Sequence, residues 1–115
     1  MGPTGTSLYQ QLRQIEFSLN RLWNDTDIVQ LDSPARRALE TVRRQIRVAQ
    51  TTAKDYELSE AEEDVKAQLK HLPRLIKALE QTRMAILKAS EYDLIGAVDV
   101  AQQTSQLDTL IERLR

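Results

Sequence analysis

The sequence contains no cysteine, only three glycines and three prolines, and few aromatic residues. Without cysteine the chain has no disulfide and no thiolate chemistry, which fits a reducing compartment and leads us to expect a cytoplasmic protein. Few aromatic residues argue against a β-sandwich, whose strands draw on aromatic and β-branched side chains. Scarce glycine also argues against the glycine-rich loops that hold nucleotide phosphates. These absences favour helices and leave little basis for catalysis.

Long apolar runs and a dominant charge are also missing. No segment approaches the ~20 apolar residues that a membrane-spanning helix needs. The 16 basic and 17 acidic side chains leave a net charge of −1, so no overall field attracts nucleic acid or an anionic membrane. Residues 1–6 lack the basic and apolar regions of a signal peptide, and we interpret them as a flexible tail or an expression scar. Residues 7–115 are expected to form a single domain.

What the sequence does contain is a large share of Leu, Ala, Gln, Glu, Arg and Lys, which have high helix propensity. A chain of 115 residues is long enough to bury one core without metal or disulfide. Apolar residues recur at alternating steps of four and three, the spacing of helices that pack along a seam. We therefore predict an all-α protein, an antiparallel three- or four-helix bundle with a long central helix kinked near Pro73.

The first predicted helix runs from about Ser7, its N-cap, to Trp23, and loop-forming residues follow at 24–27. The second opens at Asp32, which caps it, and a proline in the first turn costs no hydrogen bond. The predicted seams are Leu8, Leu12, Ile15, Leu19 and Leu22 in the first helix, and Ala35, Leu39, Val42, Ile46, Ala49, Ala53 and Tyr56 in the second. An uncharged arc is expected to widen the buried face of the second helix: Ala38, Thr41, Gln45, Val48 and Thr52.

The third predicted helix begins at Ser59-Glu60-Ala61-Glu62, which has the spacing of a capping box. Its first seam is Val65, Leu69, Leu72, Ile76 and Leu79, and a second seam is Leu75, Leu79, Ile86 and Ala89. Pro73 has no good capping residue beside it, which favours a kink in one long helix over a break. Two seams on one helix predict neighbours on two sides.

The start of the last helix has two interpretations. Ser90 to Asp93 can cap a helix that starts near Glu91, or Gly96 can end the third helix as its C′ residue with the fourth starting near Asp99. In both cases we expect helix to at least Arg113. The seam is the same in both: Val100, Thr104, Leu107, Ile111 and Leu114.

Candidate catalytic or metal-binding residues are few. His71 is the only histidine; it is a candidate base or phosphoryl acceptor, but Leu72-Pro73-Arg74 crowds the positions where an acceptor needs room. No Glu-x-x-His pair for a di-iron bundle is present, and zinc needs more His or Cys than the chain has. The acidic cluster at Glu60, Glu62, Glu63 and Asp64 suits a helix N-terminus. We predict no enzyme activity, catalytic residue, metal, cofactor or small-molecule ligand.

Five arginines form one arc on the second helix, beside its apolar seam, with Glu40 as the only acid among them. They are Arg36, Arg37, Arg43, Arg44 and Arg47, called the arginine strip below. The favoured interpretation is that the strip is solvated or pairs with acidic residues of the chain: Asp25, Asp27, Glu60, Glu63 and Asp64. A strip of this kind can also bind an acidic partner or a phosphate backbone, although it lacks interleaved aromatics.

Phe17 falls opposite the seam of the first helix, where an aromatic residue indicates a second packing layer or a contact between chains. Tyr9 and Trp23 border the seam and are candidates to extend such a patch. Met84 and Leu87 also lie off the main seams. We therefore predict a protein–protein interaction module that binds itself as a homodimer, another protein, or both. The alternative is a small nucleic-acid-binding or regulatory accessory protein that uses the arginine strip.

Overall fold

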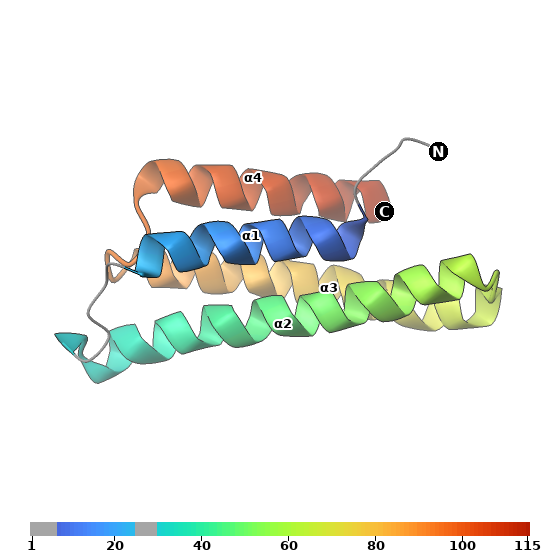
Figure 1. Ribbon diagram of the computed structural model, residues 1–115, viewed down its shortest axis with the longest axis horizontal. Helices are drawn as coiled ribbons and strands as arrows, with labels where there is room; N and C mark the ends of the chain where they lie inside the picture. Colours follow the sequence, from blue (N-terminus) through green and yellow to red (C-terminus); the bar gives the residue numbers. More distant parts are fainter. Residues whose placement is uncertain (1–6, 25–29) are drawn as a thin grey trace.

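The computed structural model describes residues 7–24 and 30–115, and helices are the only regular elements in these residues. They are α1 (Leu8–Trp23), α2 (Ser33–Ala61), α3 (Val65–Ser90) and α4 (Ala97–Leu114). Each helix runs opposite to the one before it, and the four pack against each other (Figure 1). The predicted all-α class is confirmed. The predictions for residues 1–6 and 25–27 lie outside the described residues.

The first two helices begin where the sequence predicts. The hydroxyl of Ser7 accepts from the backbone N–H of Gln10 at 3.1 Å, and the Ser7 N–H donates to Gln10 Oε1 at 3.4 Å. Asp32 accepts from the N–H of Ala35 at 3.0 Å. Both contacts satisfy donors that a helix N-terminus otherwise leaves unpaired.

The start of α3 corrects a prediction. Residues 59–62 belong to the last turn and C-cap of α2 and do not begin α3. The cap of α3 is Asp64, whose carboxylate accepts from the N–H of Ala67 at 3.0 Å. Glu63 takes the left-handed conformation, with φ of 55°, in the tight turn between the helices. Several acidic residues in a row offer alternative caps, and the spacing alone did not distinguish them.

α3 continues without a break through Pro73, as predicted, and contacts both α2 and α4. A proline removes one donor from the helix interior and leaves the carbonyl four residues earlier unpaired. That carbonyl belongs to Leu69, whose side chain is exposed. The kink at Pro73 stays a prediction.

The junction between α3 and α4 agrees with the second interpretation to within two residues, because α4 begins at Ala97. The role given to Gly96 is wrong, however. Gly96 is the N-cap of α4, whereas α3 has already ended at Ser90. Asp93 adopts the left-handed conformation there, with φ of 59°, because an aspartate tolerates it better than most non-glycine residues. The predicted helix to at least Arg113 is confirmed.

The predicted seams of α1, α2 and α4 form most of the core. Two predictions fail here, because Leu22 and Val48 are exposed. Trp23 takes the buried position at the end of α1. On α4 the sequence missed Gln103 and Leu110, which are buried. The core residues of these three helices are Leu8, Leu12, Ile15, Leu19, Trp23, Ala35, Ala38, Leu39, Val42, Ile46, Ala49, Ala53, Leu107, Leu110 and Ile111.

α2 and α3 are longer than their neighbours. They contain 29 and 26 residues, whereas α1 and α4 contain 16 and 18. At 1.5 Å per residue, α2 is roughly 20 Å longer than α1. The end of the α2–α3 hairpin therefore projects past the start of α1 and the end of α4 (Figure 1). Within the described residues, none of the helices is both long and apolar enough to cross a membrane.

The projecting hairpin explains the largest error in the predicted core. Val65 and Leu69 were assigned to the first seam of α3, but they are 64% and 69% exposed. Leu72 and Ile76, further along the same seam, are half-buried. The second predicted seam of α3 is buried as expected.

Candidate interaction surfaces

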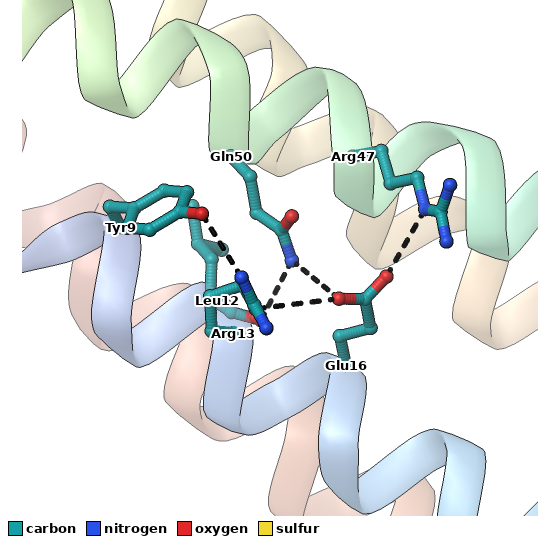
Figure 2. A network of polar contacts seen from close by, with 6 residues as sticks. All are labelled: Tyr9, Leu12, Arg13, Glu16, Arg47 and Gln50. Carbon is teal, nitrogen blue, oxygen red and sulfur yellow. Dashed lines mark hydrogen bonds and ion pairs between the residues drawn. The ribbon is translucent and has the colours of Figure 1, made fainter.

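A polar network joins α1 to α2 around the carboxylate of Glu16 (Figure 2). Gln50 Nε2 donates to Glu16 Oε1 at 3.1 Å, and Arg47 Nε lies 3.4 Å from Oε2. Arg13 Nε is 3.8 Å from Oε1. Gln50 also reaches the Leu12 carbonyl at 3.5 Å. With only 16% of its side chain exposed, Glu16 has less solvent screening than a fully exposed acid, so this network adds a polar contact to the apolar packing between α1 and α2.

The described part of the chain shows partners for the arginine strip other than the acidic residues proposed from the sequence. Among the described residues, Glu60, Glu63 and Asp64 form no ion pair with it; Asp25 and Asp27 lie outside the described ranges. Three of its members have other partners. Arg47 pairs with Glu16, Arg43 lies 5.7 Å from the centre of the Trp23 ring, and Arg36 donates to the Leu31 carbonyl at 3.3 Å.

The remaining members, Arg37 and Arg44, are exposed, and within residues 7–24 and 30–115 neither forms an ion pair. A shallow depression of about 660 Å³ lies along this part of α2. Its lining residues all come from α2: Arg43, Arg44, Arg47, Val48, Thr51 and Thr52. A single helix forms no deep pocket, so this surface suits an extended or flat partner better than a small molecule.

The three aromatic candidates of α1 do not form one patch. Phe17 is 65% exposed, as predicted. Trp23 is only 2% exposed, so its predicted place on the surface is wrong. Its indole Nε1 donates to the carbonyl of Leu94 at 2.8 Å, in the turn between α3 and α4. A wheel based on leucine spacing placed Trp23 beside the seam, but the indole fills the end of the bundle.

Tyr9 is half-buried and lies among cations. Arg13 and Lys54 lie over its ring at 5.9 and 5.6 Å from the centre. Arg13 Nη1 also donates to the Tyr9 hydroxyl at 3.1 Å, and this hydrogen bond raises the pKa of Arg13. The ring of Tyr9 therefore takes part in the α1–α2 contact, and its role in binding a partner stays a prediction.

A second shallow groove, of about 600 Å³, lies between α2 and α3 on the outer side of the hairpin. Thr41 and Gln45 line it from α2, and Met84 and Leu87 line it from α3. Met84 and Leu87 are exposed, which agrees with their predicted place off the seams.

The exposed end of the hairpin is the surface that sequence reasoning missed. Val65 and Leu69 precede Leu72 and Ile76 at helical spacing, so all four lie on one face of α3. Further along this face, Arg83 and Glu80 contact α4: Arg83 pairs with Asp108 at 2.8 Å, and Glu80 with Arg115 at 2.9 Å. Val65 and Leu69 thus extend the face of α3 that α4 covers, beyond the end of α4. The lengths of the predicted helices could have indicated this exposure, since the first and last helices are too short to reach Val65 and Leu69.

Within the described residues, no group of three or more His, Cys, Asp or Glu side chains is placed to hold a metal ion. His71 is half-buried in the first half of α3. No known protein family, curated protein or solved structure matches the chain.

Proposed function

We propose that this chain is a non-enzymatic helical interaction module that associates with itself, in a reducing compartment such as the cytoplasm. The observation that carries the proposal is the exposure of Val65 and Leu69 on the hairpin end. Apolar residues at core spacing along a helix are normally covered by a neighbouring helix. Burying the exposed part of each of these side chains is favourable by on the order of 1 kcal/mol.

Other features support the same proposal. At the α1–α2 contact, Gln50 donates to the Glu16 carboxylate and to the Leu12 carbonyl. Buried Thr82 donates to the Ala78 carbonyl of its own helix at 2.8 Å. These groups serve packing and the helix ends, and the exposed apolar faces are what the fold presents to other molecules.

Sedimentation equilibrium of the purified chain tests the proposal. We expect the average mass to rise with concentration toward twice the monomer mass. A chain that stays monomeric at its highest soluble concentration would contradict self-association.

A second candidate function is binding to nucleic acid or another polyanion through the arginine strip. The observation in its favour is that Arg37 and Arg44 are exposed and form no ion pair within the described part of the chain. The variant Arg37→Glu/Arg44→Glu tests it without disturbing Arg43 or Arg47, which contact α1. If the strip binds phosphates, the salt-dependent affinity for duplex DNA or RNA falls in this variant. An unchanged affinity and salt slope would remove the candidate.

A further inference from the structure

The face of α3 that no other described helix covers at the hairpin end would be complementary to itself if two copies of the helix were set antiparallel. Its apolar residues are Val65, Leu69, Leu72 and Ile76, called the α3 stripe below. In the antiparallel register that brings Leu69 opposite Leu72 of a second copy, Val65 comes opposite Ile76. The two exposed residues thus meet the two half-buried ones, and the pattern repeats on both sides of a two-fold axis. A self-complementary patch of this kind is the requirement for an isologous dimer.

A second copy would lie beyond the end of α4, along the same face of α3. α4 runs antiparallel to α3 and ends where Arg115 meets Glu80. The α3 helix of a second copy would also run antiparallel to α3, and its first residue would lie opposite Ile76, one turn beyond Glu80. It would therefore follow α4 in the same direction along the same face. The contact would extend the existing four-helix packing without displacing a helix.

The charges along the hairpin agree with this register. The segment from residue 55 to residue 64 contains six acids and no basic residue, namely Asp55, Glu57, Glu60, Glu62, Glu63 and Asp64. The segment from residue 65 to residue 79 contains four basic residues and no acid, namely Lys66, Lys70, Arg74 and Lys77. In the proposed register the acidic turn at Glu62–Asp64 lies opposite Lys77 of the other copy and close to Arg115 at its α4 end. Opposite charges at both ends fix the direction and register of the pairing.

We propose that the α3 stripe is a dimerisation surface, and that its occupant is the α3 stripe of a second copy, antiparallel to the first. This inference rests on the proposed function, since it names the surface through which the module associates with itself. The overlap from Val65 to Ile76 is about 18 Å of helix. Such a short contact is at the low end of specific interfaces, so the dissociation constant is expected on the order of 10⁻⁵ M.

The first test compares two double variants by sedimentation equilibrium. Val65→Glu/Leu69→Glu places charge in the stripe, and Met84→Glu/Val98→Glu makes the same chemical change at two exposed apolar positions elsewhere. Circular dichroism melting checks that both fold. We expect the stripe variant to dimerise at least about tenfold more weakly, and the control to dimerise like the wild type.

If the wild type dimerises and both variants match it, the stripe proposal is wrong while self-association stands. If the wild type is a monomer, both the stripe proposal and the proposed function fail.

The second test reverses charge at the two ends of the contact. Glu62→Lys/Glu63→Lys makes the turn basic, and Lys77→Glu/Arg115→Glu makes the facing residues acidic. Each variant alone is expected to dimerise more weakly than the wild type at low salt, because like charges then face each other. An equimolar mixture is expected to recover wild-type affinity as a heterodimer. A mixture no better than either variant alone would overturn the antiparallel register.

Discussion

Trp23 shows how one residue holds several elements of this fold together. It is the last residue of α1, its ring is buried, and Arg43 of α2 lies over it. Its indole N–H donates at 2.8 Å to the carbonyl of Leu94, which precedes α4. The end of α1 is thereby tied both to α2 and to the α3–α4 turn.

Replacing Trp23 by Phe is expected to lower the free energy of unfolding by about 2 kcal/mol. The variant loses the indole hydrogen bond, leaves the buried Leu94 carbonyl without its donor and removes buried volume. Chemical denaturation followed by circular dichroism measures the change. Phe17→Leu is the control, because Phe17 is exposed and its replacement should change stability by less than about 0.5 kcal/mol. Equal changes in the two variants would contradict the assignment of Trp23 to the core.

Tyr56 predicts a pH dependence. Partial burial, with a further contribution from nearby Glu60, raises the pKa of Tyr56 above its ordinary value of 10.0. The unfolded chain then loses this proton at lower pH than the folded chain. The stabilisation is complete below pH 10 and is lost as the pH rises through the pKa of the folded state.

The expected result is that the fall in unfolding free energy on the alkaline side of pH 10.0 is smaller in Tyr56→Phe than in the wild type. Urea denaturation on both sides of that pH measures it. Absorbance titration of the phenolate gives an independent readout, because the variant should lose the component that titrates late. Identical alkaline behaviour of the two proteins would show that Tyr56 does not contribute.

At the scale of elements, a side chain of α2 caps the N-terminus of α1. The carboxylate of Glu57 accepts from the backbone N–H groups of Leu8 and Tyr9 at 2.9 and 3.1 Å. These two donors have no partner within α1, and a negative charge at this end is also favoured by the helix dipole. Glu57 therefore sets where α1 starts along α2.

Glu57→Ala is expected to lower the free energy of unfolding by about 1–2 kcal/mol, as the loss of a charged helix cap does. Hydrogen exchange should quicken in the first turn of α1 and stay unchanged in the middle of α2. Glu60→Ala, one turn later, is the control, since within the described residues Glu60 caps no helix. Protection of Leu8 and Tyr9 equal to the wild type would contradict the capping role.

The sequence predicted those parts of the fold that depend on local pattern. Ser7 and Asp32 were identified as caps because small polar residues before an apolar repeat have few other uses. The seams of α1, α2 and α4 followed from spacing, since Leu12, Leu39 and Leu107 lie where a neighbouring helix covers the apolar side of their own helix. The same helical spacing placed the arginine strip on one arc beside the apolar seam of α2.

The remaining errors have a physical cause. Spacing shows which side of a helix Val65 and Leu69 occupy, but whether that side is covered depends on the length of another helix. Trp23 was misplaced because a large ring at a helix end packs along the bundle axis as well as sideways. Glu16, the centre of the α1–α2 network, could not be found from α1 alone, because its partners Gln50 and Arg47 come from α2.

At the scale of the whole molecule, the unequal helix lengths lead to the proposed association. All four helices lie side by side over part of the length of the bundle, and among the described residues α2 and α3 are the elements that continue past that part (Figure 1). The projecting end carries an apolar stripe, an acidic turn and a basic helix. Two copies joined along the α3 stripe would bury the stripe. The acidic turn of each copy would then pair with the basic helix of the other.

The distance between spin labels in the dimer tests the antiparallel pairing of the α3 stripe most directly. Because the chain has no cysteine, Lys66→Cys and Met84→Cys each provide a single labelling site on α3. In the antiparallel register the labels at position 66 are expected about 20 Å apart and those at position 84 about 40 Å or more apart, from the helical rise and helix spacing. Finding these two distances by pulsed electron paramagnetic resonance would support the antiparallel register. The absence of a short intermolecular distance at position 66, at concentrations where the chain is dimeric, would contradict it.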